Sequence, residues 1–291
     1  MTKQGPAAFH AYRVGSVEVC VVSDGAIAMP VTDGLALNAS AEDIRRALRE
    51  ASLPDERLTT TFAPVILQAS GKKVLIDAGL GPDFNATTNA NAGLLVPNMQ
   101  SHGIEPDEID LVVVSHFHVD HINGLLSRGN PVFPNAQIAV PEREWAFWMD
   151  DAERSRVPEG RISEIFSNSR RVFDPLRDRV RTYTDGDTIV PGLEAIETPG
   201  HSIGHMSFWL RSGSEGVFVQ GDLSNQAALF LPHPNWQSPL DQFPEQAVKT
   251  RRSVYDRLAA ERAPVQAFHH PFPGRCLIER DGDGYRRIAL A

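Results

Sequence analysis

Cysteine is scarce in this chain, and so are long apolar runs and basic charge. The 291 residues contain only two cysteines, Cys20 and Cys276, far apart in strand-like segments. We therefore expect buried free thiols and no disulfide framework, with a single disulfide between the two as the alternative. Lys and Arg number 28 against 37 Asp and Glu, which gives a net charge of −9. Because phosphate backbones are bound by basic surfaces, we expect no nucleic-acid partner.

No apolar run approaches the length of a membrane span, and residues 1–8 contain no apolar stretch of secretory length. We expect a soluble, cytoplasmic protein without membrane contact, or a mature form whose signal has been removed. Hydrophobic residues make up 42% of the chain, and no short-period repeat or low-complexity linker divides it. The length therefore predicts one globular domain over residues 1–291.

Histidine, in contrast, is concentrated in one place. Four residues able to bind a metal lie within the six positions from His116 to His121, after the strand-like residues 109–114. His116 and His118 are two apart, so both can face one ion, while Asp120 and His121 on the following turn can face a second. Imidazole and carboxylate suit Zn, Mn, Fe or Co. The absence of a nearby Cys argues against a closed structural zinc site. A solvated loop with incidental histidines is the alternative.

Further residues able to bind a metal follow later strand-like segments. These residues are His201 after 193–198, Asp222 after 216–219, and His269 and His270 after 264–267. Layered α/β proteins place their ligands on loops at the ends of strands, where a rigid scaffold holds them. The spacing therefore predicts one site assembled from several distant segments.

Five motifs of the chain resemble those of the metallo-β-lactamase-fold hydrolases in order and separation: LIDAG at 75–79, SHFHVDH at 115–121, TPGH at 198–201, GD at 221–222 and HHPFPG at 269–274. The resemblance implies an α/β protein with an αββα sandwich and two divalent metal ions per chain, zinc before Mn, Fe or Co. Within the superfamily, the HxPFPG ending and residues 134–148 look most like the branch containing methyl parathion hydrolase and broad-specificity lactonases.

The resemblance also implies a role for each ligand. It implies seven metal ligands: His116, His118 and His201 for one ion, Asp120, His121 and His269 for the other, and Asp222 as a bridge between them. His269 is preferred to His270 because the family places one residue between the ligand and PFPG. Asp77 would accept a hydrogen bond from a ligand imidazole, with an ordinary turn Asp as the alternative. His205 matches a position that does not ligate.

The implied chemistry is hydrolysis of an ester, lactone or phosphotriester bond in a small, apolar substrate. Asp120 and Asp222 would be the catalytic carboxylates that hold and orient a hydroxide shared by the metals. Five aromatic residues are candidates for an apolar substrate mouth, with core packing as the alternative for some of them: Trp145, Phe147, Trp148, Phe230 and Trp236. Residues 223–226 lack the Tyr that quorum-quenching lactonases carry near their bridging Asp, which argues against a dedicated homoserine-lactone activity.

Three other functions remain open. A glyoxalase II-like thioesterase would share all seven ligands, but it calls for a basic C-terminal patch, and the only candidates are Arg275, Arg280, Arg286 and Arg287. A β-lactamase is less favoured because enzymes with the His-x-His-x-Asp-His motif generally lack the bridging Asp. A metal-binding protein without catalytic activity is the third alternative. The partners we expect are a small-molecule substrate and, as an open alternative to a monomer, a second copy of the chain.

Apolar runs rich in β-branched residues predict the strands of two sheets. In the first half they cover residues 17–22, 62–69, 73–76, 109–114 and 137–140, and in the second half 179–183, 193–198, 205–210, 216–219 and 264–268. Ser40, with Asp43 three residues later, predicts the start of a helix. Residues 245–261 predict a long amphipathic helix.

Overall fold

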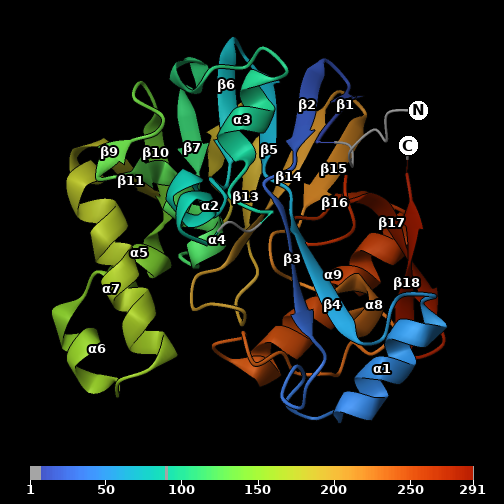
Figure 1. Cartoon of the computed structure of the whole chain (residues 1–291). Coiled ribbons are helices and arrows are strands. Elements are labelled where there is room, and N and C mark those ends of the chain that lie inside the picture. Colours follow the sequence, from blue (N-terminus) through green and yellow to red (C-terminus); the bar gives the residue numbers. More distant parts are fainter. Residues whose placement is uncertain (1–7, 89–90, 291) are drawn as a thin grey trace, which may run out of the picture.

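The computed structural model describes residues 8–88 and 91–290. Two large sheets face each other and helices cover their outer faces, so the predicted αββα sandwich is confirmed (Figure 1). The first sheet has the strand order β1 (Phe9–Val14), β2 (Val17–Val22), β5 (Val65–Ala69), β6 (Lys72–Ile76), β7 (Leu111–Val113), β10 (Gln137–Pro141) and β11 (Val180–Tyr183). The second has the order β12 (Thr188–Val190), β13 (Leu193–Glu197), β14 (Met206–Ser212), β15 (Glu215–Val219), β16 (Pro264–Gln266), β17 (Arg275–Asp281) and β18 (Gly284–Ala289).

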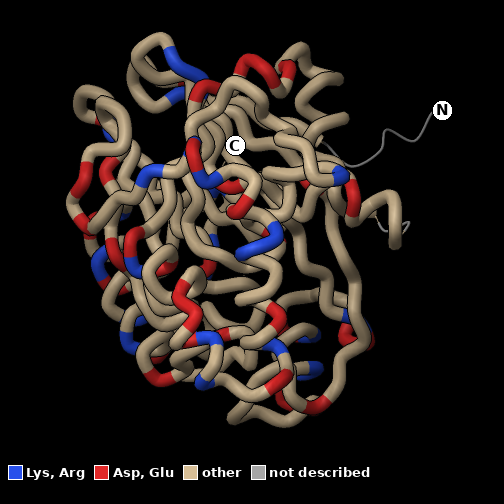
Figure 2. The backbone as a smooth tube through the Cα atoms, turned by 90° about the vertical axis from the view of Figure 1, so that its left-hand side faces the viewer, with Lys and Arg blue, Asp and Glu red and all other residues tan. Residues whose placement is uncertain are grey.

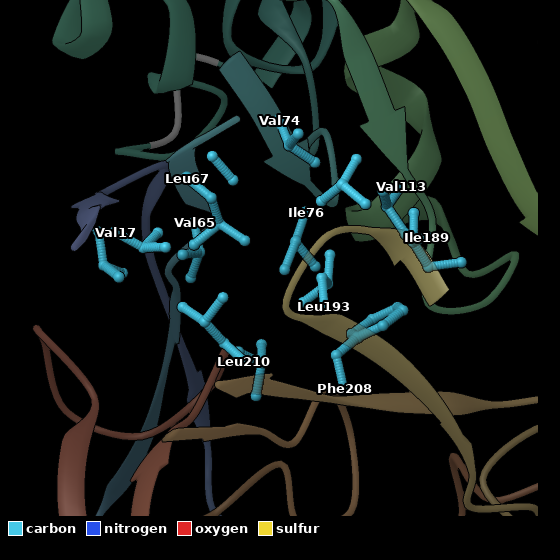
Figure 3. Close-up of a cluster of buried hydrophobic side chains, with 14 of the residues drawn as sticks. Val17, Val65, Leu67, Val74, Ile76, Val113, Ile189, Leu193, Phe208 and Leu210 are labelled. Carbon is cyan, nitrogen blue, oxygen red and sulfur yellow. The ribbon is translucent and has the colours of Figure 1, made fainter. Parts of the chain in front are cut away.

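A buried apolar layer joins the two sheets. Side chains of both sheets meet there, including Val65, Leu67 and Ile76 of the first and Phe208 and Leu210 of the second (Figure 3). Successive residues of a strand point to opposite faces, and the intervening residues of β5 and β6 therefore pack against the helices outside the first sheet. Both faces of these strands are buried, which explains why their sequences are continuously apolar.

Helices complete the outer layers. Against the first sheet lie α3 (Leu95–Gln100), α5 (Glu142–Trp148) and α7 (Arg161–Phe173), and against the second lies α9 (Pro244–Glu261). The remaining helical segments are α1 (Ala41–Glu50), α2 (Pro82–Thr88), α4 (Val119–Ile122), α6 (Asp151–Arg156), α8 (Ala227–Phe230) and the 3₁₀ turns η1 (Pro106–Glu108), η2 (Asn123–Leu125) and η3 (Asp174–Arg179). Ser40 and Asp43 form the capping box that starts α1, and the long helix predicted from residue 245 begins one residue earlier.

Two strand predictions are wrong in part. Residues 62–69 do not form one strand, because β4 (Arg57–Phe62) ends and β5 begins on either side of Ala63-Pro64, and proline has no N–H for a ladder. Instead β4 pairs antiparallel with β3 (Gly25–Pro30) in a separate two-stranded sheet, the β3–β4 sheet, which reaches away from the large sheets toward α1 and α8 (Figure 1). The strand predicted at 179–183 belongs to the first sheet, where β11 pairs in parallel with β10. A short hairpin pairs β8 (Leu126–Ser127) with β9 (Asn130–Pro131).

The cysteines lie in the interior of the fold and the charged residues lie mostly on its outside. Cys20 and Cys276 are buried free thiols in different sheets, as predicted. Basic and acidic residues are interspersed around the outside of the fold in the view of Figure 2. Within residues 8–88 and 91–290, no helix is both long and apolar enough to cross a membrane.

Candidate metal centre

The seven predicted ligands meet at one end of the sandwich. His116 and His118 follow β7, and Asp120 and His121 lie on α4 directly after them. The other three come from loops after strands of the second sheet: His201 after β13, Asp222 after β15 and His269 after β16. Their ligand atoms form overlapping groups of three, each group within 4.8 Å. Segments more than 150 residues apart in sequence therefore build one cluster.

Three imidazoles converge on a first point. His116 Nε2 lies 2.9 Å from His118 Nδ1, which lies 2.8 Å from His201 Nε2. Burial holds the pKa values of His116 and His118 well below the ordinary histidine value, so both rings are neutral and present lone pairs. Burial opposes protonation of His201, but the acids Asp222 and Asp241 raise its pKa to about 9. Once His201 has lost its proton, one cation can accept a lone pair from each of these three nitrogens.

Carboxylates and imidazoles converge on a second point beside the first. His121 Nε2 lies 3.2 Å from Asp222 Oδ1, and His269 Nε2 lies 3.3 Å from Asp120 Oδ2. Asp222 Oδ2 lies 3.1 Å from His269 Nε2 and 3.2 Å from His201 Nε2. Asp222 therefore touches ligands of both groups, as a carboxylate that bridges two cations would.

Three of the imidazoles, those of His121, His201 and His269, have their far nitrogen held by an acceptor of the protein. Asp77 Oδ2 accepts from His121 Nδ1 at 2.8 Å, and the Thr61 carbonyl accepts from His269 Nδ1 at 2.8 Å. His201 Nδ1 donates to Asp241 at 2.9 Å, and Arg251 lies 3.5 Å from the other oxygen of that carboxylate. Such bonds fix the tautomer of each ring and aim its other nitrogen at the site.

Asp77 takes the position predicted from its motif, and its backbone is that of a turn. Its φ is +62°, a left-handed conformation that Asp adopts more readily than most residues. Its Oδ1 accepts from the Ser115 N–H at 2.7 Å, and its Oδ2 accepts from the Ser115 hydroxyl at 2.8 Å as well as from His121. The turn and the hydrogen bond to an imidazole are therefore parts of one arrangement.

Two buried atoms of the cluster are without a hydrogen-bond partner in the described part of the chain. They are His121 Nε2 and Asp222 Oδ1. Buried polar atoms normally have a partner, so these two atoms fit a position where a cation would be bound by both. Nitrogen and oxygen donors without sulfur fit zinc and its first-row neighbours. The residues present therefore fit a pair of divalent cations.

Two neighbouring histidines stay outside the cluster. His205 Nδ1 lies 2.8 Å from Thr198 Oγ1, and its Nε2 accepts from the Asp222 N–H at 2.9 Å. His205 therefore positions the backbone of Asp222 without contributing a ligand atom. His270 is fully buried beside Gln220, 3.4 Å from its amide nitrogen, and belongs to none of the ligand groups.

Glu144 is a residue of this region to which the sequence assigned no role. Its carboxylate is fully buried, and one oxygen accepts from the Phe117 N–H and from the Trp148 indole N–H, both at 2.9 Å. The other oxygen accepts from the Gly204 N–H at 2.7 Å. Phe117 lies between two ligand histidines and Gly204 lies three residues after His201, so Glu144 ties together both loops of the three-histidine site. Its sequence signal was a carboxylate directly before the aromatic residues of α5.

A cavity of about 640 Å³ opens over the ligand cluster. His118, Asp120, His201, Asp222 and His269 line its floor. One wall, here called the apolar wall, comes from the β3–β4 sheet and α8 and consists of Ile27, Met29, Leu58, Phe62, Leu229 and Phe230. The facing side comes from α7 and the loop at residues 238–240.

The predicted aromatic mouth is wrong except for Phe230. Trp148 is 1% exposed and belongs to the core outside the first sheet, and Trp145 and Phe147 pack against that core. Trp236 stacks on His233 and packs beside α1. None of these four is among the described residues that line the cavity. The α5 aromatics face inward because one side of a helix that covers a sheet must be apolar.

Comparisons with known proteins agree with this geometry. The sequence pattern of the metallo-beta-lactamase superfamily matches residues 63–265. The N-acyl homoserine lactonase AttM of Azorhizobium caulinodans is 33% identical over 179 residues, which cover 59% of this chain and 61% of that protein. An N-acyl homoserine lactonase of Bacillus thuringiensis is 25% identical over 188 residues, which cover 58% of this chain and 66% of that protein. The matches thus span less than two thirds of these relatives' own length.

Solved structures share the fold over nearly the whole chain. AidC, described as a dizinc quorum-quenching lactonase in complex with a product, superposes with a TM-score of 0.90 at 22% identity and covers 98% of each chain. The hydrolase AbOPH superposes with a TM-score of 0.89 at 23% identity and covers 99% of each chain. At such identities the likeness shows the fold. Because the superfamily pattern matches well over half of the sequence, this chain belongs to the metallo-beta-lactamase superfamily.

Proposed function

We propose that this chain is a two-metal hydrolase that opens the ester bond of lactones with an apolar substituent, N-acyl homoserine lactones among them. One observation carries the proposal: the seven-ligand cluster forms the floor of a cavity with a largely apolar wall. A small-molecule ester can reach such a floor while its hydrocarbon part leaves water. The lactonases among the relatives support the same substrate class.

The chain's own residues supply position and charge. When bound, two divalent cations polarise the substrate carbonyl and lower the pKa of a water enough for it to attack near neutral pH. Asp222 holds the two halves of the cluster at a fixed separation. Burial opposes ionisation of Asp120, but His121 and His269 lower its pKa to about 2, so Asp120 stays a carboxylate and can orient the attacking water by accepting its hydrogen bond. Asp120 also lines the cavity, where it meets the substrate.

The thioesterase alternative finds no support in the cavity. None of the four C-terminal arginines lines it within the described chain. Arg280 forms an ion pair with Asp256 and Arg286 with Glu279, on the far strands of the second sheet. Arg275 stacks over Tyr12, and Arg287 donates to the Pro271 carbonyl. A charged glutathione group would meet a mainly apolar surface instead.

The missing Tyr after Asp222 argued against homoserine lactones, yet the relatives matched here carry that activity in their names. We therefore keep these lactones in the proposal. Other polar groups on the cavity surface can take the role of a hydrogen-bond donor, including Thr60, Asn225 and Arg161.

A substrate panel on protein of measured metal content tests the proposal. The panel contains N-hexanoyl-homoserine lactone, γ-decalactone, a p-nitrophenyl ester, a methyl parathion-type triester, lactoylglutathione and a cephalosporin. We expect the lactones to give the highest kcat/KM and chelator to abolish their turnover. A preference for lactoylglutathione or for the triester would overturn the lactone assignment, and activity that survives complete metal removal would overturn the two-metal chemistry.

A further inference from the structure

Arg161 is the only Lys or Arg among the described residues that line the cavity. It is the first residue of α7, and its guanidinium donates to the Pro239 carbonyl at 3.0 Å and to the Leu240 carbonyl at 2.8 Å. These bonds hold the guanidinium against the side of the cavity that faces the apolar wall. No carboxylate of the described chain forms an ion pair with it, although Asp120 and Asp241 contribute favourable longer-range charge. Arg161 is thus a fixed cation with unused hydrogen-bonding capacity.

The Arg161 guanidinium has more N–H donors than the protein around it offers acceptors. A guanidinium has five N–H groups, and the two carbonyls use one on each terminal nitrogen. Arg161 Nη2 also lies 3.4 Å from His118 Nε2. His118 directs its Nδ1 lone pair into the three-histidine site, and a neutral imidazole that does so carries its proton on Nε2. Arg161 and His118 then present two N–H donors side by side, and neither can accept from the other.

We propose that Arg161 and the Nε2–H of His118 bind a second oxygen of the substrate, the carbonyl oxygen of an amide that joins the lactone ring to its apolar chain. This inference rests on the proposed function. A carbonyl oxygen has two lone pairs and can accept from both donors at once. It would lie beside a metal ligand, next to the reacting ester, while the chain beyond the amide crosses to the apolar wall.

The charges of the cavity favour a neutral acceptor over an anionic one. Glu164 lines the cavity on the same helix as Arg161, so a carboxylate or phosphate substituent bound there would meet an acid that is not a metal ligand as well as the arginine. An amide oxygen avoids that repulsion and still accepts strong charge-assisted bonds. The site therefore discriminates lactones that carry an amide next to the ring from lactones that carry a plain alkyl chain.

A pair of lactones of similar apolar reach tests this inference. N-hexanoyl-homoserine lactone has the amide, and γ-decalactone has a hexyl chain without it. In Arg161→Met we expect KM for the amide lactone to rise about 10- to 100-fold with little change in kcat, since a charge-assisted bond to substrate is lost. For γ-decalactone we expect a change of less than about twofold. Arg161→Lys, which keeps one charged donor, should recover part of the loss.

A binding measurement and a matched control complete the design. Calorimetry with the ring-opened N-hexanoyl-homoserine should show about tenfold weaker binding to Arg161→Met than to the parent protein. Arg156→Met removes an exposed arginine of the neighbouring α6, outside the cavity lining, and should leave both measurements unchanged. Equal losses for both lactones, or unaltered binding in Arg161→Met, would overturn the inference. Failure of the parent protein to open either lactone would refute the proposed function instead, and the calorimetric comparison would still decide the role of Arg161.

Discussion

His121 Nε2 and Asp222 Oδ1 lie 3.2 Å apart in the buried centre of the site, and neither atom has a hydrogen-bond partner in the described chain. The other nitrogen of His121 is already bonded to Asp77. Burial opposes protonation of His121, but Asp222 and neighbouring acids raise the pKa of the ring, so charge attraction rather than a hydrogen bond joins these two atoms in the metal-free chain. A cation bound by both atoms takes the place of the His121 proton, so the folded chain favours metal binding at this point.

Metal removal should therefore destabilise the protein. We expect elemental analysis of protein prepared without chelator to approach two divalent ions per chain, because seven ligands exceed the need of one tetrahedral site. Chelation should lower the melting temperature, since ligands that bind only the folded state stabilise it. Saturation at one metal per chain would contradict the two-metal assignment.

Asp222→Asn should disable chemistry more than folding. The carboxylate touches ligands of both metal groups, so its loss disturbs their spacing and should reduce kcat by about a thousandfold or more. Circular dichroism should show a retained fold. Asp107→Asn, at an exposed acid of η1, is the matched control and should keep full activity. A well-folded Asp222→Asn protein with unchanged turnover would rule out a bridging role.

Metal binding should release protons at neutral pH. Burial opposes protonation of His201 and His269, but Asp222 and neighbouring acids raise their pKa values to about 9 and about 10 in the metal-free cluster. Both rings are therefore protonated at pH 7.5 and must lose a proton to bind a cation. Burial also opposes protonation of His121, but Asp222 and neighbouring acids raise its pKa well above the ordinary value, so it is the third ring that must lose a proton. Titration calorimetry in buffers of different ionisation enthalpy should show release of about three protons, and affinity should fall as pH falls. Binding without proton release would show that these rings are already neutral.

Glu144→Gln should weaken the three-histidine site selectively. In the parent protein each carboxylate oxygen of Glu144 accepts from a backbone N–H. The Gln amide has only one acceptor oxygen, so its NH₂ group would face one of these N–H donors and that hydrogen bond would be lost. We expect about 10- to 100-fold weaker binding of one of the two metals in a chelator competition. Trp148→Phe removes the indole donor and part of a buried ring but keeps both backbone N–H bonds to Glu144, so it should leave both affinities close to those of the parent. Two unchanged metal affinities in Glu144→Gln would refute its positioning role.

Aromatic core residues and cavity residues should respond differently to truncation. Trp148→Ala should lower the free energy of unfolding by about 3–5 kcal/mol, because the indole is fully buried outside the first sheet. Met29→Ala, on the apolar wall and 40% exposed, should leave stability nearly unchanged. It should raise KM for long-chain lactones about threefold or more and spare γ-butyrolactone, which cannot reach that wall. A larger increase in KM for folded Trp148→Ala than for Met29→Ala would show that Trp148 contacts the substrate.

Short-range patterns determined most of the elements. Alternating or continuous apolar runs placed β2, β6, β10 and β15, and the Ser40 capping box placed α1. The histidine spacing indicated metal chemistry by itself, because ligand type depends on the residue and local spacing on the strand or turn that carries it. The family motifs then supplied all seven residues that the structure brings together.

Tertiary structure decided which distant groups meet. Nothing near Asp241 or Glu144 in sequence reveals that one orients His201 and the other joins two ligand loops, because those contacts span 40 and 60 residues. From sequence, the aromatic residues of α5 fit a position at the substrate cavity as well as a position in the core. Only the packing of that helix on the first sheet places them in the core. The β3–β4 sheet and Arg161 line one cavity for the same reason. A sequence fixes the chemistry and periodicity of each segment, whereas the burial of their apolar faces against one another selects the neighbours.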